Sequence, residues 1–386
     1  MKTTIVTYAD LGEFSNYKTP GIIPIICKLD ENNELEKVIC RRSKNFHFKN
    51  TFPAFSYISF FLFKGIVKSI KNLFTINEYR WEKKIIDNFS ASKINESRVI
   101  ILHPLVFRKT ARQAKKRGII SIGIATSCHT NYVKKIIKEE SELFGLSLPL
   151  NKNRSFCKSI SNLDYIVAYS TFTRKTFIEE GFPKDNIFVA YSDIDIQKYN
   201  NIQKINDNIF RILYVSHTCL RKGLHYLIES YKKINIPNSE LIIVGNIKLP
   251  KKLEIKVKNE IESNPSIKWV GFSSHPEKYY RKASVFVLPS LEEGNPKVVM
   301  EAMAAGLPVI ATENARSIIE DGKTGFVVPI RDSNKIKEKI IFLYNNKDIA
   351  KKMGDEARHA MENKKSFGDE FFEIYLKILK RENIKV

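Results

Sequence analysis

The sequence predicts an α/β fold of two domains, each a doubly wound parallel sheet, facing each other across a cleft. In both halves of the 386-residue chain, short and almost continuously apolar segments alternate with amphipathic helical segments. This alternation is typical of parallel sheets that helices cover on both faces. It stops over residues 198–208, which are polar and without periodicity, and then restarts. A chain of this length can bury a separate core in each domain.

The first half contains runs of β-branched and other apolar residues that predict strands. They lie at residues 3–8, 22–27, 38–40, 99–102, 119–125, 165–168 and 187–190. Helical periodicity lies between them, for example at 108–117 and 133–144. We expect residues 1–197 to form one domain, with 198–208 as the linker.

The second half repeats the pattern more regularly. Strands are expected at residues 211–215, 240–244, 267–270, 285–288 and 308–311, with a turn and strand within 321–329. Helices are expected at 222–233, 253–263, 275–282, 298–305 and 334–345. These elements predict a second domain over residues 209–365. A last helix at 369–380, within 366–386, can pack back on the first domain or cap the second.

The cysteines and the first residues favour a cytoplasmic protein. Five cysteines are scattered, odd in number and without a C-x-x-C pair, which argues against disulfides and a zinc site. Residues 1–8 are expected to be a core strand, too short and too polar afterwards for a signal peptide. No run reaches the ~20 apolar residues that cross a bilayer.

Positive charge is concentrated in the first domain. Residues 41–120 hold 18 Lys and Arg against 4 Asp and Glu, which is +14 of the net +22. Such a field favours an anionic partner: acidic lipid headgroups at the inner face of the membrane, a lipid-linked diphosphate or nucleic acid. A generally Lys-rich composition is the alternative; it explains the total excess of positive charge, and explains the local concentration less well. No nucleic-acid-binding module accompanies the charge, so we expect no nucleic acid. The Phe-rich segment 52–67 fits either a membrane-interface segment or a buried helix.

The segment SLEEGNPKVVMEAMAAGLPVI, residues 290–310, carries the most chemical information. It follows a buried strand, and we expect Asn295 to cap a helix with Pro296 in its first turn. Glu293 then lies in the loop, and Glu301 lies about 7.5 Å along the helix from Pro296. Free N–H groups at the helix start favour an anion. Two carboxylates beside such a helix start suit a ligand with both hydroxyls and phosphate, such as a nucleotide sugar.

The same segment resembles the E-x7-E region of retaining glycosyltransferases of family 4. The flanking LPS and the EAMAxGxPVI pattern make the resemblance specific. It implies the GT-B fold, retention of the anomeric configuration, and no metal or other cofactor. A nucleoside diphosphate sugar of UDP or GDP type would be the donor, and a saccharide or lipid-linked saccharide for a surface polymer the acceptor. Glu293 would contact the donor sugar and Glu301 the ribose.

The segment 214–223, YVSHTCLRKG, is similar to the family's element that binds the donor phosphates. Lys222 and Gly223 match the family pattern, whereas His217 stands in place of its usual Arg. Arg221 or a protonated His217 can substitute for that Arg. The full expected donor-binding set is His217, Arg221, Lys222, Glu293, Gly294, Asn295, Pro296, Lys297, Val298 and Glu301.

His129 follows a predicted strand of the first domain and would face the donor sugar. Together with Glu293 it forms the expected catalytic pair; His103 is a second, weaker candidate. The D-x-D at Asp193 and Asp195 is interpreted as a turn, not a metal site. Arg316 departs from the family and would either reshape the nucleotide contacts or face solvent. A catalytically impaired GT-B scaffold and a sugar-nucleotide epimerase of the same fold stay open as alternatives.

Overall fold

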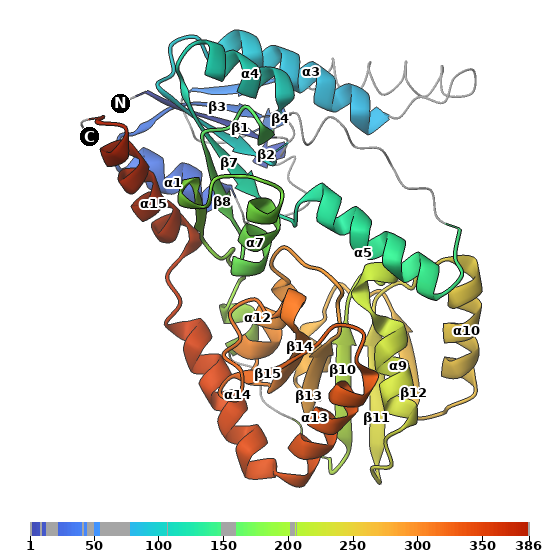
Figure 1. The fold of residues 1–386 in the computed structure, drawn as a ribbon. Helices are drawn as coiled ribbons and strands as arrows, with labels where there is room; N and C mark the ends of the chain where they lie inside the picture. The colour runs from blue at the N-terminus through green and yellow to red at the C-terminus, as the bar shows by residue number, and fades with distance from the viewer. Residues whose placement is uncertain are drawn as a thin grey trace.

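The computed structural model describes residues 2–7, 10–12, 22–40, 42–44, 50–54, 78–105, 107–147, 160–200, 205 and 207–384. These residues form two α/β domains, which Figure 1 shows one above the other. Most of the Phe-rich segment 52–67 lies outside the described residues, and so does part of the basic region 41–120. The prediction of two doubly wound parallel sheets is confirmed.

The first domain is built on a seven-stranded sheet in which every described pair of neighbours is parallel. Its strand order is β5 (Thr51–Pro53), β3 (Leu35–Cys40), β1 (Thr3–Thr7), β6 (Val99–His103), β7 (Ile120–Ala125), β8 (Tyr165–Ala168) and β9 (Ile187–Val189). The order reverses between β1 and β6, the place where open α/β sheets bind ligands. A separate pair joins β2 (Asp10–Gly12) to β4 (Arg42–Lys44).

Alternate residues of these strands enter two cores, one on each face of the sheet. Val99 and Ile101 face α1 (Ile23–Glu31) and α15 (Phe367–Arg381). Ile100 and Leu102 face α3 (Glu78–Lys93), α4 (Arg108–Lys116) and α7 (Thr171–Glu179). The period of two along β6 therefore fills both faces with apolar side chains.

The predicted strand at residues 22–27 is wrong: this segment begins α1. Pro24 lies in the first turn of the helix, where its missing N–H is not needed. Ile22, Ile25, Ile26 and Leu29 are buried, a spacing that repeats with the helical and not the strand period. Isoleucine is β-branched and frequent in strands, so the composition of this segment predicted a strand instead.

The second domain is built on a six-stranded parallel sheet. Its order is β12 (Ile267–Gly271), β11 (Ser239–Val244), β10 (Phe210–Val215), β13 (Val285–Leu288), β14 (Val309–Thr312) and β15 (Gly325–Val328). The order reverses between β10 and β13. The helices of this domain are α9 (Leu224–Lys232), α10 (Lys251–Glu262), α11 (Glu277–Tyr280), α12 (Lys297–Ala304), α13 (Ser333–Asn345) and α14 (Lys347–Glu362). Short 3-10 turns occur in both domains: η1 (Lys184–Asn186) lies in the first, and η2 (Leu220–Lys222) and η3 (Glu313–Ala315) lie in the second.

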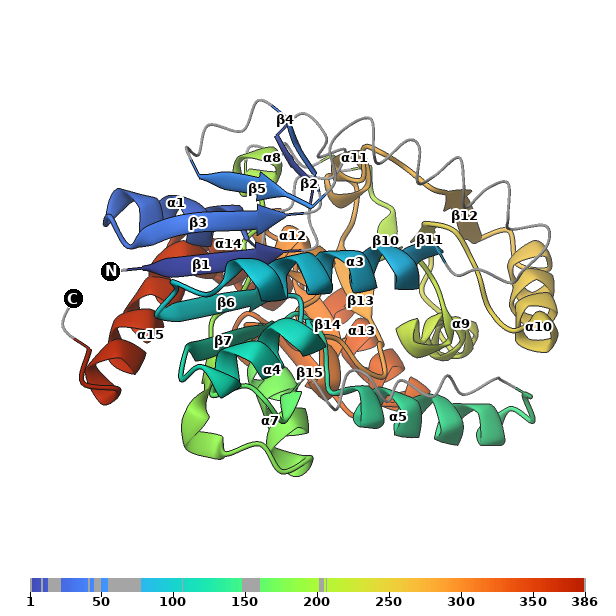
Figure 2. The ribbon, with the colours of Figure 1, turned by 90° about the horizontal axis from the view of Figure 1, so that it is seen from above.

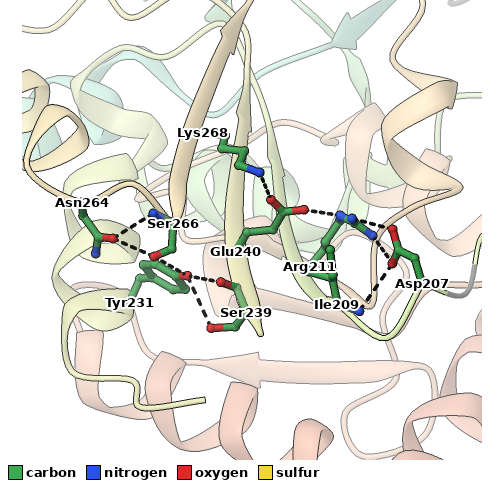
Figure 3. A network of polar contacts seen from close by, with 9 residues as sticks. All are labelled: Asp207, Ile209, Arg211, Tyr231, Ser239, Glu240, Asn264, Ser266 and Lys268. Atoms are coloured by element: carbon green, nitrogen blue, oxygen red, sulfur yellow. Dashed lines mark hydrogen bonds and ion pairs between the residues drawn. The ribbon is translucent and has the colours of Figure 1, made fainter. Parts of the chain in front are cut away.

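A polar network ties the amino ends of β10, β11 and β12 together (Figure 3). Arg211 pairs with Glu240 on the neighbouring strand and, at 2.6 Å, with Asp207 at the end of the linker. Lys268 binds the other oxygen of Glu240 at 2.5 Å. The network lies at the opposite strand ends from the loops that carry Arg221 and Glu293, so we assign it a structural role.

Among the described residues, three segments cross between the domains. Helix α8 (Gln197–Asn200) lies in the linker and contacts α12. Helix α5 (Thr130–Leu143) leaves β7 and lies against the second domain, and α15 returns from α14 to pack on α1, as Figures 1 and 2 show. Within the described ranges, no helix combines the length and apolar character that a bilayer crossing requires.

Candidate functional site

The loop after β10 and the loop after β13 meet at the switch point of the second sheet. Gly223 allows this contact: its φ is +67°, and an added Cβ would lie 2.0 Å from the carbonyl oxygen of Pro289. A larger residue would therefore suffer both backbone strain and a clash. The tight approach places the cations of η2 beside the carboxylates that follow β13.

A cluster of four charged side chains results. The Lys222 ammonium pairs with Oε1 of Glu293, and Arg221 lies 3.4 Å from its Oε2. Nη1 of Arg221 also binds Oε1 of Glu292 at 3.1 Å, while Ser290 Oγ donates to Glu293 at 2.9 Å. Glu292 and Glu293 are both buried. The predicted proximity of Lys222, Arg221 and Glu293 is thus found in the structure.

Burial and the neighbouring charges shift the pKa values of this cluster in opposite directions. Burial raises the pKa of Glu292, although the Arg221 guanidinium counteracts the effect. Burial disfavours the charged Arg221, but the carboxylates of Glu293 and Glu292 raise its pKa overall. Arg221 therefore remains a fixed cation, while a third of its side chain is still exposed to an incoming anion (32%).

Glu301 occupies a second polar position on α12. Its Oε2 accepts a hydrogen bond of 3.0 Å from the Tyr280 hydroxyl, and Tyr199 of the linker also bonds to it. Burial raises the pKa of Glu301, against the opposing effect of these hydroxyls. Burial of the Tyr280 hydroxyl likewise raises the pKa of Tyr280 well above its ordinary value.

The start of α12 differs from the prediction by one position. Pro296, not Asn295, is the N-cap residue, and no side chain caps the helix. The Asn295 amide instead donates to Ser192 Oγ of the other domain at 3.1 Å and accepts from Ser317. Lys297 begins the helix, and burial lowers its pKa. The Val298 carbonyl accepts from the Tyr280 hydroxyl at 3.3 Å.

The first domain closes over Glu293 and Gly294. Thr173 Oγ1 donates to the Gly294 carbonyl at 3.1 Å, and Cys128 Sγ to the Glu293 carbonyl at 3.2 Å. The approach is close: a Cβ on Gly294 would lie 2.1 Å from the carbonyl oxygen of Thr126. The site is therefore bounded by both domains.

His129 is the residue after Cys128, and it is buried beside this contact. Its Nδ1 accepts from the Asn131 amide at 3.3 Å, which makes His129 the N-cap of α5. Its ring packs edge-on against Phe177 at 5.2 Å, and burial lowers its pKa. The structure thus gives His129 a capping role and favours its neutral form. His103, at the end of β6, is also buried, which lowers its pKa to about 4.

The structure also places His217, Arg316 and Asp193, whose roles were considered from the sequence. His217 is exposed in the loop after β10, whereas the ion pairs of Glu292 and Glu293 are formed with Arg221 and Lys222. Arg316 is exposed and donates to the Ile319 carbonyl at 3.1 Å. Asp193 accepts from the Phe367 amide at 2.9 Å and pairs with Lys364 at 3.2 Å, so it anchors the start of α15. The turn interpretation of Asp193 agrees with these contacts.

Glu292, Tyr280 and Tyr199 were not among the site residues predicted from the sequence. Glu292 directly precedes Glu293, and its place in the same loop was a usable signal. Tyr280 and Tyr199 have no such signal, because only tertiary structure brings them to Glu301: Tyr199 through the packing of α8 against α12, and Tyr280 through its hydrogen bond to Glu301.

Known proteins resemble this chain in sequence and in fold. Residues 195–360 match the model of the family described as glycosyl transferases group 1. The lipopolysaccharide outer core galactosyltransferase WaaB superposes with a TM-score of 0.67 at 15% identity, covering 98% of this chain and 100% of WaaB. The chain has the GT-B glycosyltransferase fold. The Anabaena protein HepE, in complex with UDP and glucose, shares this GT-B fold with a TM-score of 0.65 at 14% identity, over 98% of this chain and 99% of HepE.

The curated sequence relatives match parts of this chain. The capsular polysaccharide biosynthesis glycosyltransferase CapM of Staphylococcus aureus is 33% identical over 172 residues, which are 44% of this chain and 44% of CapM. The chain spans about half the length of the curated relatives it matches first.

Proposed function

We propose that this protein is a retaining, metal-independent glycosyltransferase. It transfers a sugar from a nucleoside diphosphate sugar of UDP or GDP type to a saccharide or lipid-linked saccharide during synthesis of a surface polysaccharide. The contact of Arg221 and Lys222 with Glu293 at the switch point is the observation that carries the proposal. The relation to CapM and the UDP and glucose in the HepE complex support the substrate class.

The cluster can stabilise a leaving diphosphate. When the bond from the anomeric carbon to the phosphate oxygen breaks, its electron pair goes to the nucleoside diphosphate. Arg221 and Lys222 lie where that charge would develop, and the free N–H groups at the start of α12 add to their field. The acceptor hydroxyl forms the new bond to the anomeric carbon, and its proton passes to the departing diphosphate.

The carboxylates would hold the neutral parts of the donor. Glu293 accepts hydrogen bonds from Lys222 and Ser290 at present, and sugar hydroxyls would join or replace these donors. Glu301 would accept from the ribose hydroxyls, in exchange for Tyr280 or Tyr199. The His129 region would form the opposite wall and orient the sugar.

The test is a screen of UDP-, GDP- and ADP-sugars by thermal shift, followed by measurement of nucleoside diphosphate release. We expect one donor to raise the melting temperature and to be hydrolysed slowly without acceptor, with loss of both effects in Glu293→Gln. Binding without any hydrolysis or transfer would favour the impaired scaffold. A change of sugar configuration without release of the nucleotide would favour the epimerase.

We propose further that the first domain meets an anionic membrane surface from the cytoplasmic side. Helix α4 carries five Arg and Lys and no acid over Arg108–Lys116, and its neighbour α3 presents Lys84 and Trp81 to solvent. Each cation near an anionic surface adds about 1 kcal/mol. Flotation with vesicles of phosphatidylglycerol and phosphatidylcholine tests this: the protein should float with the anionic vesicles and not with pure phosphatidylcholine, and absence of flotation with both would refute it.

A further inference from the structure

Helix α5 belongs to the first domain by its place in the sequence but to the second by its packing. Ile136 is buried in the core cluster of the second domain, and Tyr132 and Phe144 pack on the same cluster. These residues and Glu140 repeat every four positions, so they share one face of the helix. Figure 1 shows α5 extending from the first domain along the edge of the second, toward α9 and α10.

Glu140 is the polar member of that face, and it is fully buried. Its Oε1 binds Nε2 of His225 at 2.8 Å and accepts from the Tyr226 hydroxyl at 2.7 Å. Its Oε2 accepts from Nε of Arg331 at 2.8 Å, and the same guanidinium reaches Glu139 at 3.1 Å. All three partners of Glu140 belong to the second domain.

These contacts fix one docking position of α5. A buried carboxylate is costly unless each oxygen is paired, so a shift of the helix by a hydrogen-bond length would leave a charge unpaired. Burial by itself raises the pKa of Glu140, but the hydrogen bonds from His225 and Arg331 reverse the effect and lower it. Glu140 is therefore ionised, and its charge is opposed by that of Arg331.

The docking position lies next to the cations of the donor site. His225 and Tyr226 are the second and third residues of α9, and only Gly223 and Leu224 separate them from Lys222. Helix α5 also contacts η2, the turn that contains Arg221 and Lys222. Glu140 therefore holds the first turn of α9, which follows Arg221 and Lys222 closely in the sequence.

The other end of α5 reaches the carboxylate loop. The Asn314 amide donates to the Tyr132 hydroxyl at 3.0 Å and to the Leu291 carbonyl at 2.8 Å. The Asn314 carbonyl in turn accepts from the Glu293 amide at 3.2 Å. One helix therefore braces both halves of the site, the cations through Glu140 and the carboxylate loop through Tyr132.

From this geometry we propose that Glu140 is a positioning residue for donor binding. It holds the start of α9 against α5, and thereby holds Arg221 and Lys222 where the diphosphate binds. The proposal rests on the proposed function, since it assigns Glu140 to the same donor site. Glu140 itself touches neither donor nor acceptor in this scheme.

Isothermal titration with UDP, and with GDP in parallel, tests the proposal on the full-length protein. Glu140→Gln keeps the side-chain shape and removes the charge, and we expect the affinity for the nucleotide that binds wild type to fall about tenfold. Glu142→Gln is the matched control, because Glu142 lies on the exposed face of the same helix and pairs only loosely with Lys138, at 3.7 Å. This control should bind as wild type does.

A double-mutant cycle separates positioning from general stability. If Glu140 acts through the cations, Glu140→Gln should change the affinity less than about twofold in a Lys222→Ala background. An equal loss of affinity in both backgrounds would overturn the proposal, and so would a lower melting temperature with unchanged affinity. If Glu140→Gln does not fold, Arg331→Lys replaces it, with the same expectation.

Nucleotide binding by wild type distinguishes failure of the positioning role from failure of the proposed function. If wild type binds UDP or GDP and Glu140→Gln binds equally well, the positioning role is refuted and the proposed function stands. If wild type binds neither nucleotide, the proposed function is refuted and the positioning role with it.

Discussion

The sharpest prediction concerns Gly294, where the two domains touch. In Gly294→Ala the new Cβ would lie 2.1 Å from the Thr126 carbonyl oxygen and 2.9 Å from Cα of Ser127. Both neighbours are backbone atoms, so no side chain can rotate away. A Cβ contact shorter than 3.0 Å is essentially never found, so the loop must withdraw by at least 0.9 Å, the difference between 3.0 and 2.1 Å. A displacement of about 1 Å at a site of this kind costs about 100-fold in rate.

The assay is release of nucleoside diphosphate from the donor found by screening, at saturating concentration, with the melting temperature measured in parallel. Overpacking should also cost about 1–3 kcal/mol of stability. Gly354→Ala is the matched control: its Cβ would lie 2.4 Å from the Gly306 carbonyl oxygen, a similar backbone clash between α14 and the end of α12. The control should lose stability and keep its kcat. A folded Gly294→Ala protein with kcat within about threefold of wild type would refute the reasoning.

Three further predictions follow from single side chains. Lys222→Ala should lower kcat/KM by about 100- to 1000-fold, because it removes a cation from the leaving group; steady-state kinetics that show less than a tenfold loss would contradict this. Burial raises the pKa of Glu301 above 4.5, so the folded protein holds that proton more tightly than the unfolded chain, and stability from this group is lost as pH rises through the raised value. The melting temperature of Glu301→Gln relative to wild type should therefore increase from about pH 4.5 to pH 7, and a constant difference would count against a raised pKa. Phe371→Ala, in the buried face of α15, should lower the free energy of unfolding in urea by about 3–5 kcal/mol and leave the affinity for the nucleotide that binds wild type unchanged; a loss below about 1 kcal/mol would show that α15 is dispensable.

The sheets were predictable wherever the strands are buried on both faces. Strands β13 and β8 have the predicted bounds, because four consecutive apolar residues with turn signals on each side admit few other structures. The same rule failed for α1, where isoleucines resemble a strand until Pro24 and the buried positions reveal a helix. Local composition therefore predicts central strands well and Ile-rich amphipathic helices poorly.

The candidate site was predictable to the extent that it depends on topology. Lys222 and Glu293 follow neighbouring parallel strands, whose carboxyl ends must meet at one edge of the sheet. The partners of Glu301 and Glu140 were not predictable, because helix packing brings them from distant segments. Glu140 lies 85 residues from His225 and 191 from Arg331, and neither pair has a spacing signature.

The return of α15 to the first domain has a consequence for protein engineering. Phe367, Phe371 and Tyr375 fill the core under β1 and β6, so the amino-terminal half lacks part of its interior until the last fifteen-residue helix has been synthesised. A fragment cut at the linker would expose this apolar surface and tend to aggregate. A chimera that combines one domain of this chain with one domain of a GT-B glycosyltransferase should therefore have two junctions, one in the linker and one near Lys365, so that each half keeps its native interior.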